Sequence, residues 1–72
     1  MRISRNKSYK VWALGLDGKQ FAPSIVDSFA NLCEIHYTVK RQFWSKTIKT
    51  IHIYCIDDDE YAVYNNKMKR LY

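Results

Sequence analysis

Hydrophobic and polar residues follow a period of two near both ends of the chain and a helical period in the middle. Residues 9–16 alternate, and the Asp17 and Gly18 that follow them are a strong signal for a two-residue hairpin turn. Residues 48–56 form the longest run of strand-forming residues. Residues 60–64 return after three aspartates that predict a second turn. The pattern therefore predicts a β-hairpin near each end of the chain.

The pattern also predicts how these strands are used. Trp12, Leu14 and Leu16 share one side of the first strand and are expected to face the rest of the domain. A turn at the second and third aspartates pairs Tyr54 with Val63 in the second hairpin. The two hairpins can remain separate, with the second acting as a wing, or they can pair into one small sheet.

The middle of the chain predicts two short helices joined by a tight corner. Ser24 and Asp27 have the spacing of a capping box, and apolar residues follow at helical spacing as far as Cys33. Residues 34–36 interrupt this stripe, and a second helix is expected to start at Tyr37. The predicted fold is α+β: a β-hairpin, a helix-turn-helix and a C-terminal β-hairpin, which together make a small winged-helix-like domain.

Seventy-two residues make a single domain, with a basic N-terminal arm at residues 1–8 and a basic C-terminal tail at residues 65–72. No apolar run approaches the roughly 20 residues that a membrane-spanning helix needs. No signal peptide precedes the domain, so we expect a cytoplasmic protein, in the host cytoplasm if it is viral. In that compartment Cys33 and Cys55 are expected to be buried free thiols, with a disulfide as the alternative.

The net charge of +5 is unevenly distributed. Residues 37–50 hold four basic residues and no acidic one, whereas residues 57–60 are all acidic. Basic charge that is segregated in this way indicates a polyanionic partner, although many small proteins are basic for solubility alone.

The second predicted helix would present a polar, basic outer side to DNA. Lys40 and Arg41 are candidates for contacts with base edges, because Arg is the commonest reader of guanine. Tyr37 and Thr38, at the start of that helix, could hold phosphates, and Gln42 also faces outward. An ordinary solvated helix surface is the alternative interpretation of the same residues.

Other basic residues could extend this surface. Lys46 and Lys49 are candidate phosphate clamps, or simply solvated lysines beside a strand. Arg2 and Arg5 could enter a minor groove, as the basic arms of other helix-turn-helix proteins do, or belong to a frayed terminus.

Three short motifs carry a family resemblance: Asp17-Gly18-Lys19-x-Phe21, Ser24-Ile25-x-Asp27 and Thr38-Val39-x-Arg41. Together they resemble the intron-encoded nuclease repeat, a modular DNA-binding unit of homing endonucleases and some small phage proteins. The resemblance covers residues 17–43 and implies a helix-turn-helix. It also implies that Tyr37, Thr38, Lys40 and Arg41 lie on the groove-facing helix.

Catalysis, metals and cofactors have little support in the sequence. It contains no recognisable carboxylate pair, nucleophile with a base, or phosphate-cradling glycine loop, so we expect neither an enzyme nor a cofactor. No Cys or His pair has the spacing of zinc ligands. Residues 57–60 could bind a divalent cation or mimic phosphates, but they lack the spacing of a calcium loop and fit a hairpin tip. Trp12 and Trp44 could stack on bases or belong to the core.

We therefore predict a small DNA-binding protein, viral or prokaryotic, that regulates transcription through a helix-turn-helix. One short helix reads a half-site weakly, so it would dimerise or use its basic arms. The first alternative is an inhibitor of a host polymerase, nuclease or defence complex, which would bind its target through tyrosines and residues 57–60. The second alternative is RNA binding through the basic tail and the aromatic residues.

Overall fold

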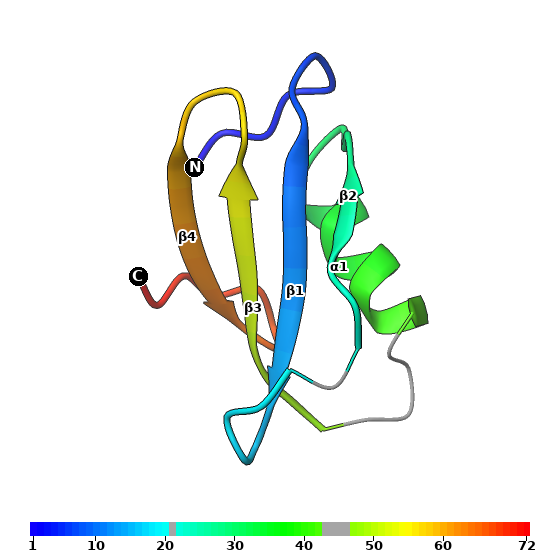
Figure 1. Ribbon diagram of the computed structural model, residues 1–72, viewed down its shortest axis with the longest axis vertical. Coiled ribbons are helices and arrows are strands. Elements are labelled where there is room, and N and C mark those ends of the chain that lie inside the picture. The colour runs from blue at the N-terminus through cyan, green and yellow to red at the C-terminus, as the bar shows by residue number, and fades with distance from the viewer. Residues whose placement is uncertain (21, 43–46) are drawn as a thin grey trace.

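The computed structural model describes residues 1–20, 22–42 and 47–72. Within them the chain forms a four-stranded antiparallel sheet, in the order β2-β1-β3-β4, and one helix (Figure 1). The elements are β1 (Tyr9–Gly15), β2 (Ile25–Asp27), α1 (Leu32–Gln42), β3 (Ile48–Cys55) and β4 (Glu60–Asn65). Because β1 pairs along its whole length with β3, the two ends of the chain share one sheet. The first strand and the second hairpin therefore share one sheet, as the alternative prediction held, but the other neighbour of β1 is β2 and not a return strand directly after the Asp-Gly turn.

The predicted helix-turn-helix, and the winged-helix-like fold built on it, are wrong. Residues 25–27, expected within a first helix, form β2 and pair with residues 9–11 of β1. Ile25 and Val26 are β-branched, so they favour an extended backbone over a helix. α1 (Leu32–Gln42) is the only helix among the described residues, and a winged helix requires several.

α1 begins at a capping box seven residues later than the predicted one. The Asn31 side-chain oxygen accepts a hydrogen bond from the Glu34 amide at 2.9 Å, and the Glu34 carboxylate accepts one from the Ala30 amide at 2.9 Å. Asn is among the strongest N-cap residues, and the Glu34 carboxylate reaches past it to the preceding amide, which makes this a variant of the capping box. Residues 34–36, predicted to be a corner, therefore lie inside the helix, and Ile35 is fully buried.

The core lies between α1 and the inner face of the sheet. Successive strand side chains point to opposite faces, and on β1 the inward positions are Tyr9, Val11 and Ala13. Ile35 and Val39, four apart on α1, are both fully buried. The core residues are Tyr9, Val11, Ala13, Phe29, Ile35, Val39, Ile48, Ile51, Ile53, Cys55, Ala62 and Tyr64. The alternation predicted for β1 is confirmed, but its buried side is that of Val11 and not that of Trp12.

Both predicted turns are present, but the first has a three-residue loop, 16–18, where two residues were predicted, because the Gly15 amide donates to the Lys19 carbonyl at 3.0 Å. Gly18 adopts φ +78°, and its amide donates to the Gly15 carbonyl at 2.9 Å, as a turn with glycine at this position allows. In the second hairpin, Tyr54 lies opposite Tyr61, whereas the sequence predicted Val63. The register differs by two because the connection contains four residues, 56–59.

Candidate functional site

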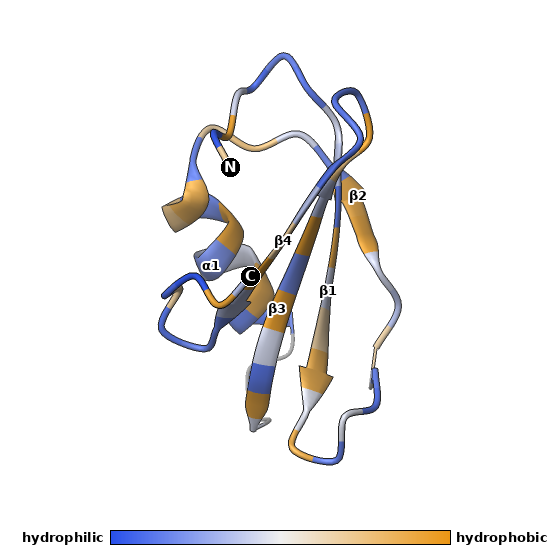
Figure 2. Cartoon of the chain, turned by 90° about the vertical axis from the view of Figure 1, so that its left-hand side faces the viewer, coloured by the Kyte–Doolittle hydropathy of each residue, from blue (hydrophilic) through white to orange (hydrophobic). Residues whose placement is uncertain are grey.

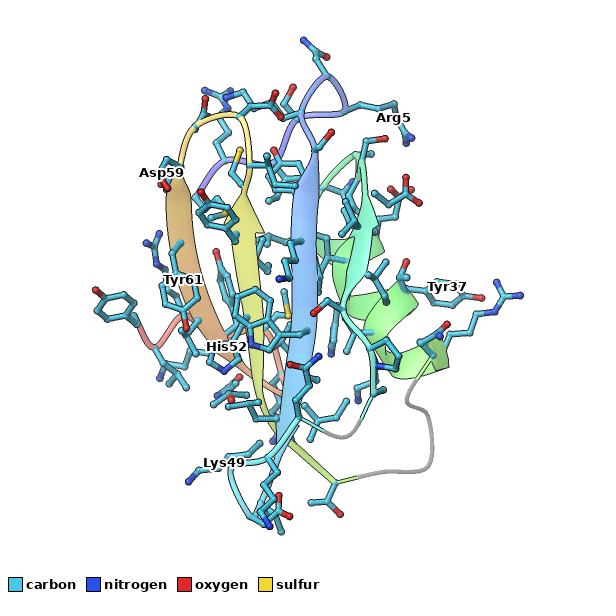
Figure 3. The ribbon with its side chains drawn as sticks, in the orientation of Figure 1. Arg5, Tyr37, Lys49, His52, Asp59 and Tyr61 are labelled. Atoms are coloured by element: carbon cyan, nitrogen blue, oxygen red, sulfur yellow. The ribbon has the colours of Figure 1, made fainter. Side chains whose placement is uncertain are left out.

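One face of the sheet is not covered by any helix of the described residues. Figure 2 shows α1 on one side of the strands only, and Figure 3 looks onto the opposite side. Because side chains alternate along each strand, the register places nine residues of the three longest strands on this side. We call it the open face; its residues are Lys10, Trp12 and Leu14 of β1, Thr50, His52 and Tyr54 of β3, and Tyr61, Val63 and Asn65 of β4.

Three rings lie close together and nearly parallel on the open face. The Trp12 and His52 ring centroids are 5.3 Å apart at an interplanar angle of 14°. Tyr61 lies 6.0 Å from Trp12 at 14° and 5.9 Å from His52 at 25°. We call these residues the aromatic triad. Near-parallel, offset rings at this separation stabilise the fold by more than the burial of their apolar area alone.

The centre of the triad is held by hydrogen bonds. His52 Nδ1 lies 2.6 Å from the Tyr61 hydroxyl, and His52 Nε2 lies 2.8 Å from the Thr50 hydroxyl. Both ring nitrogens are therefore paired, and either tautomer can serve, because each hydroxyl can donate or accept. His52 is only 9% exposed, and this burial lowers its pKa below the ordinary value of 6.5. The imidazole is thus predominantly neutral at pH 7. The two hydrogen bonds hold the His52 ring in one orientation within the triad.

The triad is only partly covered, and a lysine lies beside it. Tyr61 is 38% exposed, and Trp12 is partly exposed. Lys10 Nζ lies 5.8 Å from the centroid of the Trp12 ring, a cation–π distance. Among the nine residues of the open face, Lys10 is the only charged one at neutral pH, because the other eight are uncharged. The face itself is therefore aromatic and weakly positive, and the nearest carboxylate given by its hydrogen bonds is that of Asp59, at the end of the face where Tyr54 lies.

The acidic turn at residues 57–60 is largely engaged by this chain itself. Asp57 accepts a hydrogen bond from the Ser8 amide at 2.6 Å, and Asp58 forms an ion pair with Lys7. That hydrogen bond to Asp58 raises the pKa of Lys7. Figure 3 shows Asp59 at one end of the sheet and Lys49 at the other.

The residues predicted to read a major groove lie on α1, away from the open face. Tyr37 is 66% exposed, and Figure 3 shows its side chain pointing away from the sheet. Lys40, Arg41 and Gln42 are exposed in the last turn of the helix. The Thr38 hydroxyl donates within the helix, to the carbonyl of Glu34 at 2.8 Å. These five residues therefore form one helix surface, but no second helix of the described residues braces it.

The remaining predicted contacts are dispersed. Arg5 forms an ion pair of 3.5 Å with Glu34 of α1, and Arg2 is exposed in the same terminal segment. Ile3 of that segment packs against the core. Lys49 is exposed next to the irregularity where β1 and β3 shift register. Lys46 and Trp44 lie outside the described residues.

The sequence reasoning missed His52 and Tyr61 as members of one site. The available signal was the polar and aromatic set at alternate positions of β3, Thr50, His52 and Tyr54, beside the more obvious isoleucines. Trp12 was recognised as a stacking candidate. Its neighbour Tyr61 was missed because the predicted register between β3 and β4 was wrong by two residues.

Other site types find little in the described part of the chain. Residues 1–20, 22–42 and 47–72 contain no group of three His, Cys, Asp or Glu side chains able to hold a metal ion. Both cysteines are free; Cys55 is buried as predicted, whereas Cys33 is exposed on α1, contrary to prediction. No helix among these residues has the length and apolarity required to cross a bilayer.

Comparison of the chain with protein-family models, curated proteins and solved structures gave no match. The geometry of the open face is therefore what supports a function for this chain.

Proposed function

We propose that this protein binds single-stranded nucleic acid on the open face of its sheet. The observation that carries the proposal is the aromatic triad: Trp12, His52 and Tyr61 are nearly parallel, His52 is buried, and Trp12 and Tyr61 are partly exposed. Single-strand binding proteins combine aromatic platforms with a basic surface, and stacking needs no particular base because every base has a π-face. RNA-binding sheets use the same device, in which aromatics on a four-stranded sheet stack two or three bases.

The triad meets the physical requirements of such a platform. Its central ring is fixed by hydrogen bonds to Thr50 and Tyr61, so little side-chain entropy remains to be lost when a base stacks. Lys10 beside Trp12 supplies a phosphate contact at the same place. Duplex DNA would leave the rings without a partner, since its bases are stacked on one another. A role on single-stranded DNA or RNA in the cytoplasm accords with the absence of a spanning helix in the described residues.

A fluorescence-polarisation titration tests the proposal. Labelled oligothymidylate and oligouridylate of 12 nucleotides would be compared with a 12-base-pair duplex at 50 and 200 mM salt. We expect both single strands to bind more tightly than the duplex. Trp12→Ala should weaken single-strand binding by about 5- to 140-fold, the equivalent of about 1–3 kcal/mol for one stacked base.

Two further variants make the result specific to the open face. Tyr37→Ala removes an exposed aromatic ring from the other side of the molecule and should leave affinity unchanged. Lys10→Gln keeps the fold and should reduce the salt slope of log K by about 0.7, the value for one single-strand phosphate contact. Equal losses in Trp12→Ala and Tyr37→Ala, or tighter binding of the duplex, would contradict the proposal.

A second candidate function is recognition of a protein partner, such as a host enzyme that this protein inhibits. The observation that favours it is the hydrogen bond of 2.6 Å from the Tyr54 hydroxyl to Asp59, which joins the open face to the acidic turn. Tyrosine is enriched at binding hot spots, and an adjacent acidic rim would select a basic partner. Binding of a defined partner that Tyr61→Ala abolishes, with no oligonucleotide bound at 50 mM salt, would support this candidate over the first.

A further inference from the structure

We infer that residues 67–72 form the second half of the nucleic-acid surface, with Tyr72 stacking on a base and Lys69 and Arg70 contacting phosphates. We call these residues the return segment. The inference rests on the proposed function and extends it, because it assigns the direction in which a single strand crosses the sheet.

The return segment is held alongside β4 by its backbone. The Asn65 side chain accepts hydrogen bonds from the amides of Lys67 and Lys69, both at 2.9 Å, and Met68 adopts φ 62°. This tight turn reverses the chain. The Asn65 amide then donates to the Lys69 carbonyl at 2.9 Å, and the Leu71 amide donates to the Val63 carbonyl at 2.8 Å. The segment is therefore a positioned extension of the sheet.

Tyr72 continues the row of rings that starts on β1. Its centroid lies 5.8 Å from that of Tyr61 at an angle of 54°, and the residue is 71% exposed. The four rings thus come from β1, β3, β4 and the return segment, and because Val63 and not Tyr61 lies opposite His52, they run obliquely to the strands. The Tyr72 ring is tilted against the rings of the triad, so it offers a separate position on which a base can stack. A base stacked there adds to the two or three bases that a four-stranded sheet accommodates.

Positive charge accompanies this end of the row. Lys67, Lys69 and Arg70 are all exposed. The Arg70 Nε donates to the Tyr72 backbone carbonyl at 2.9 Å. The two ion pairs among the described residues, Arg5 with Glu34 and Lys7 with Asp58, both lie elsewhere. The charge of the return segment is therefore available to a phosphodiester backbone that leaves the triad in this direction.

The chain offers a matched pair of charge variants. Lys69 and Arg70 are adjacent on the return segment, and Lys40 and Arg41 are adjacent on α1, so each double change to Gln removes the same charge. With 12-nucleotide oligothymidylate, we expect Lys69→Gln with Arg70→Gln to reduce the salt slope of log K by about 1.4. Lys40→Gln with Arg41→Gln should leave the slope unchanged. Equal reductions in the two double variants would overturn the inference.

Ring variants and strand length complete the test. We expect Tyr72→Ala to weaken binding of the 12-nucleotide strand by about 5- to 140-fold, and Tyr72→Phe to retain it. On thymidine monophosphate, a single nucleotide that cannot occupy the triad and Tyr72 together, Tyr72→Ala should have little effect. Circular dichroism would confirm that each variant is folded. If Tyr72→Ala binds normally while Trp12→Ala does not, the inference fails and the proposed function stands. Failure of the unaltered protein to bind any single strand overturns both.

Discussion

Removal of the Tyr61 hydroxyl is a direct test of whether the aromatic triad is a built, desolvated cluster. Tyr61→Phe retains the ring and its stacking on Trp12 and His52, but it removes the partner of His52 Nδ1. His52 is 9% exposed, so water has little access to replace the lost hydrogen bond. A buried polar group left without a partner costs about 1–3 kcal/mol, which is the expected fall in the free energy of unfolding.

The adjacent tyrosine supplies the control. Tyr54 lies directly opposite Tyr61 across the two strands, and its hydroxyl also makes a hydrogen bond of 2.6 Å, to Asp59. That bond raises the pKa of Tyr54, but Asp59 is exposed and can exchange the hydroxyl for water. Tyr54→Phe should therefore change the free energy of unfolding by no more than about 0.5 kcal/mol.

Urea denaturation followed by far-ultraviolet circular dichroism at pH 7.5 measures both variants. In thermal unfolding, the same loss in Tyr61→Phe corresponds to a fall in Tm of at least about 4 °C for a domain of this size. Equal midpoints for Tyr61→Phe and Tyr54→Phe would refute the reasoning, because they would show that the His52 hydrogen bond is worth no more than a surface one.

Three further predictions concern the core, the histidine and the helix start. Ile53→Ala, at a fully buried position, should lower the free energy of unfolding by about 2–5 kcal/mol in urea denaturation. Ile56→Ala, at an exposed position, should lower it far less. Similar losses in the two variants would contradict the assignment of Ile53 to the core. Because burial lowers the folded-state pKa of His52, the unfolded chain binds more protons just below pH 6.5, so stability should fall as the pH falls through this range. His52→Gln should flatten this dependence of the urea midpoint on pH, whereas an equal flattening in His36→Gln would argue against His52 as its source. Asn31→Ala should lower the thermal midpoint through the loss of the N-cap, worth about 1 kcal/mol, and an unchanged midpoint would contradict the capping box.

Local signals predicted the features of this fold that are decided locally. Side-chain period and turn chemistry are sufficient to predict the Asp-Gly turn, strand β1 and the hairpin of β3 and β4. The choice of helix start was not decided locally, because Ser24 and Asn31 both fit a capping box. Pairing of β2 with β1 selects an extended backbone after Ser24, which leaves Asn31 to begin the helix.

The candidate site depended on longer-range information still. β1 is apolar on both sides, so the sequence could not show whether Val11 or Trp12 faces the core. Pairing with β3 and cover by α1 make that choice, and they leave Trp12 beside His52. The four-residue connection in the second hairpin then brings Tyr61 to the same cluster. A two-residue turn would have placed Val63 opposite Tyr54 instead.

The return segment also affects how the protein behaves at high concentration. By donating to and accepting from Val63 and Asn65, it occupies main-chain groups along the outer margin of β4 that would otherwise be free. Unpaired N–H and C=O groups on an edge strand can pair with a strand of another chain. Lysines near such an edge discourage this pairing because their charges repel one another. A preparation clipped after residue 66 is therefore expected to aggregate through β4, so proteolysis at this site should be monitored during purification.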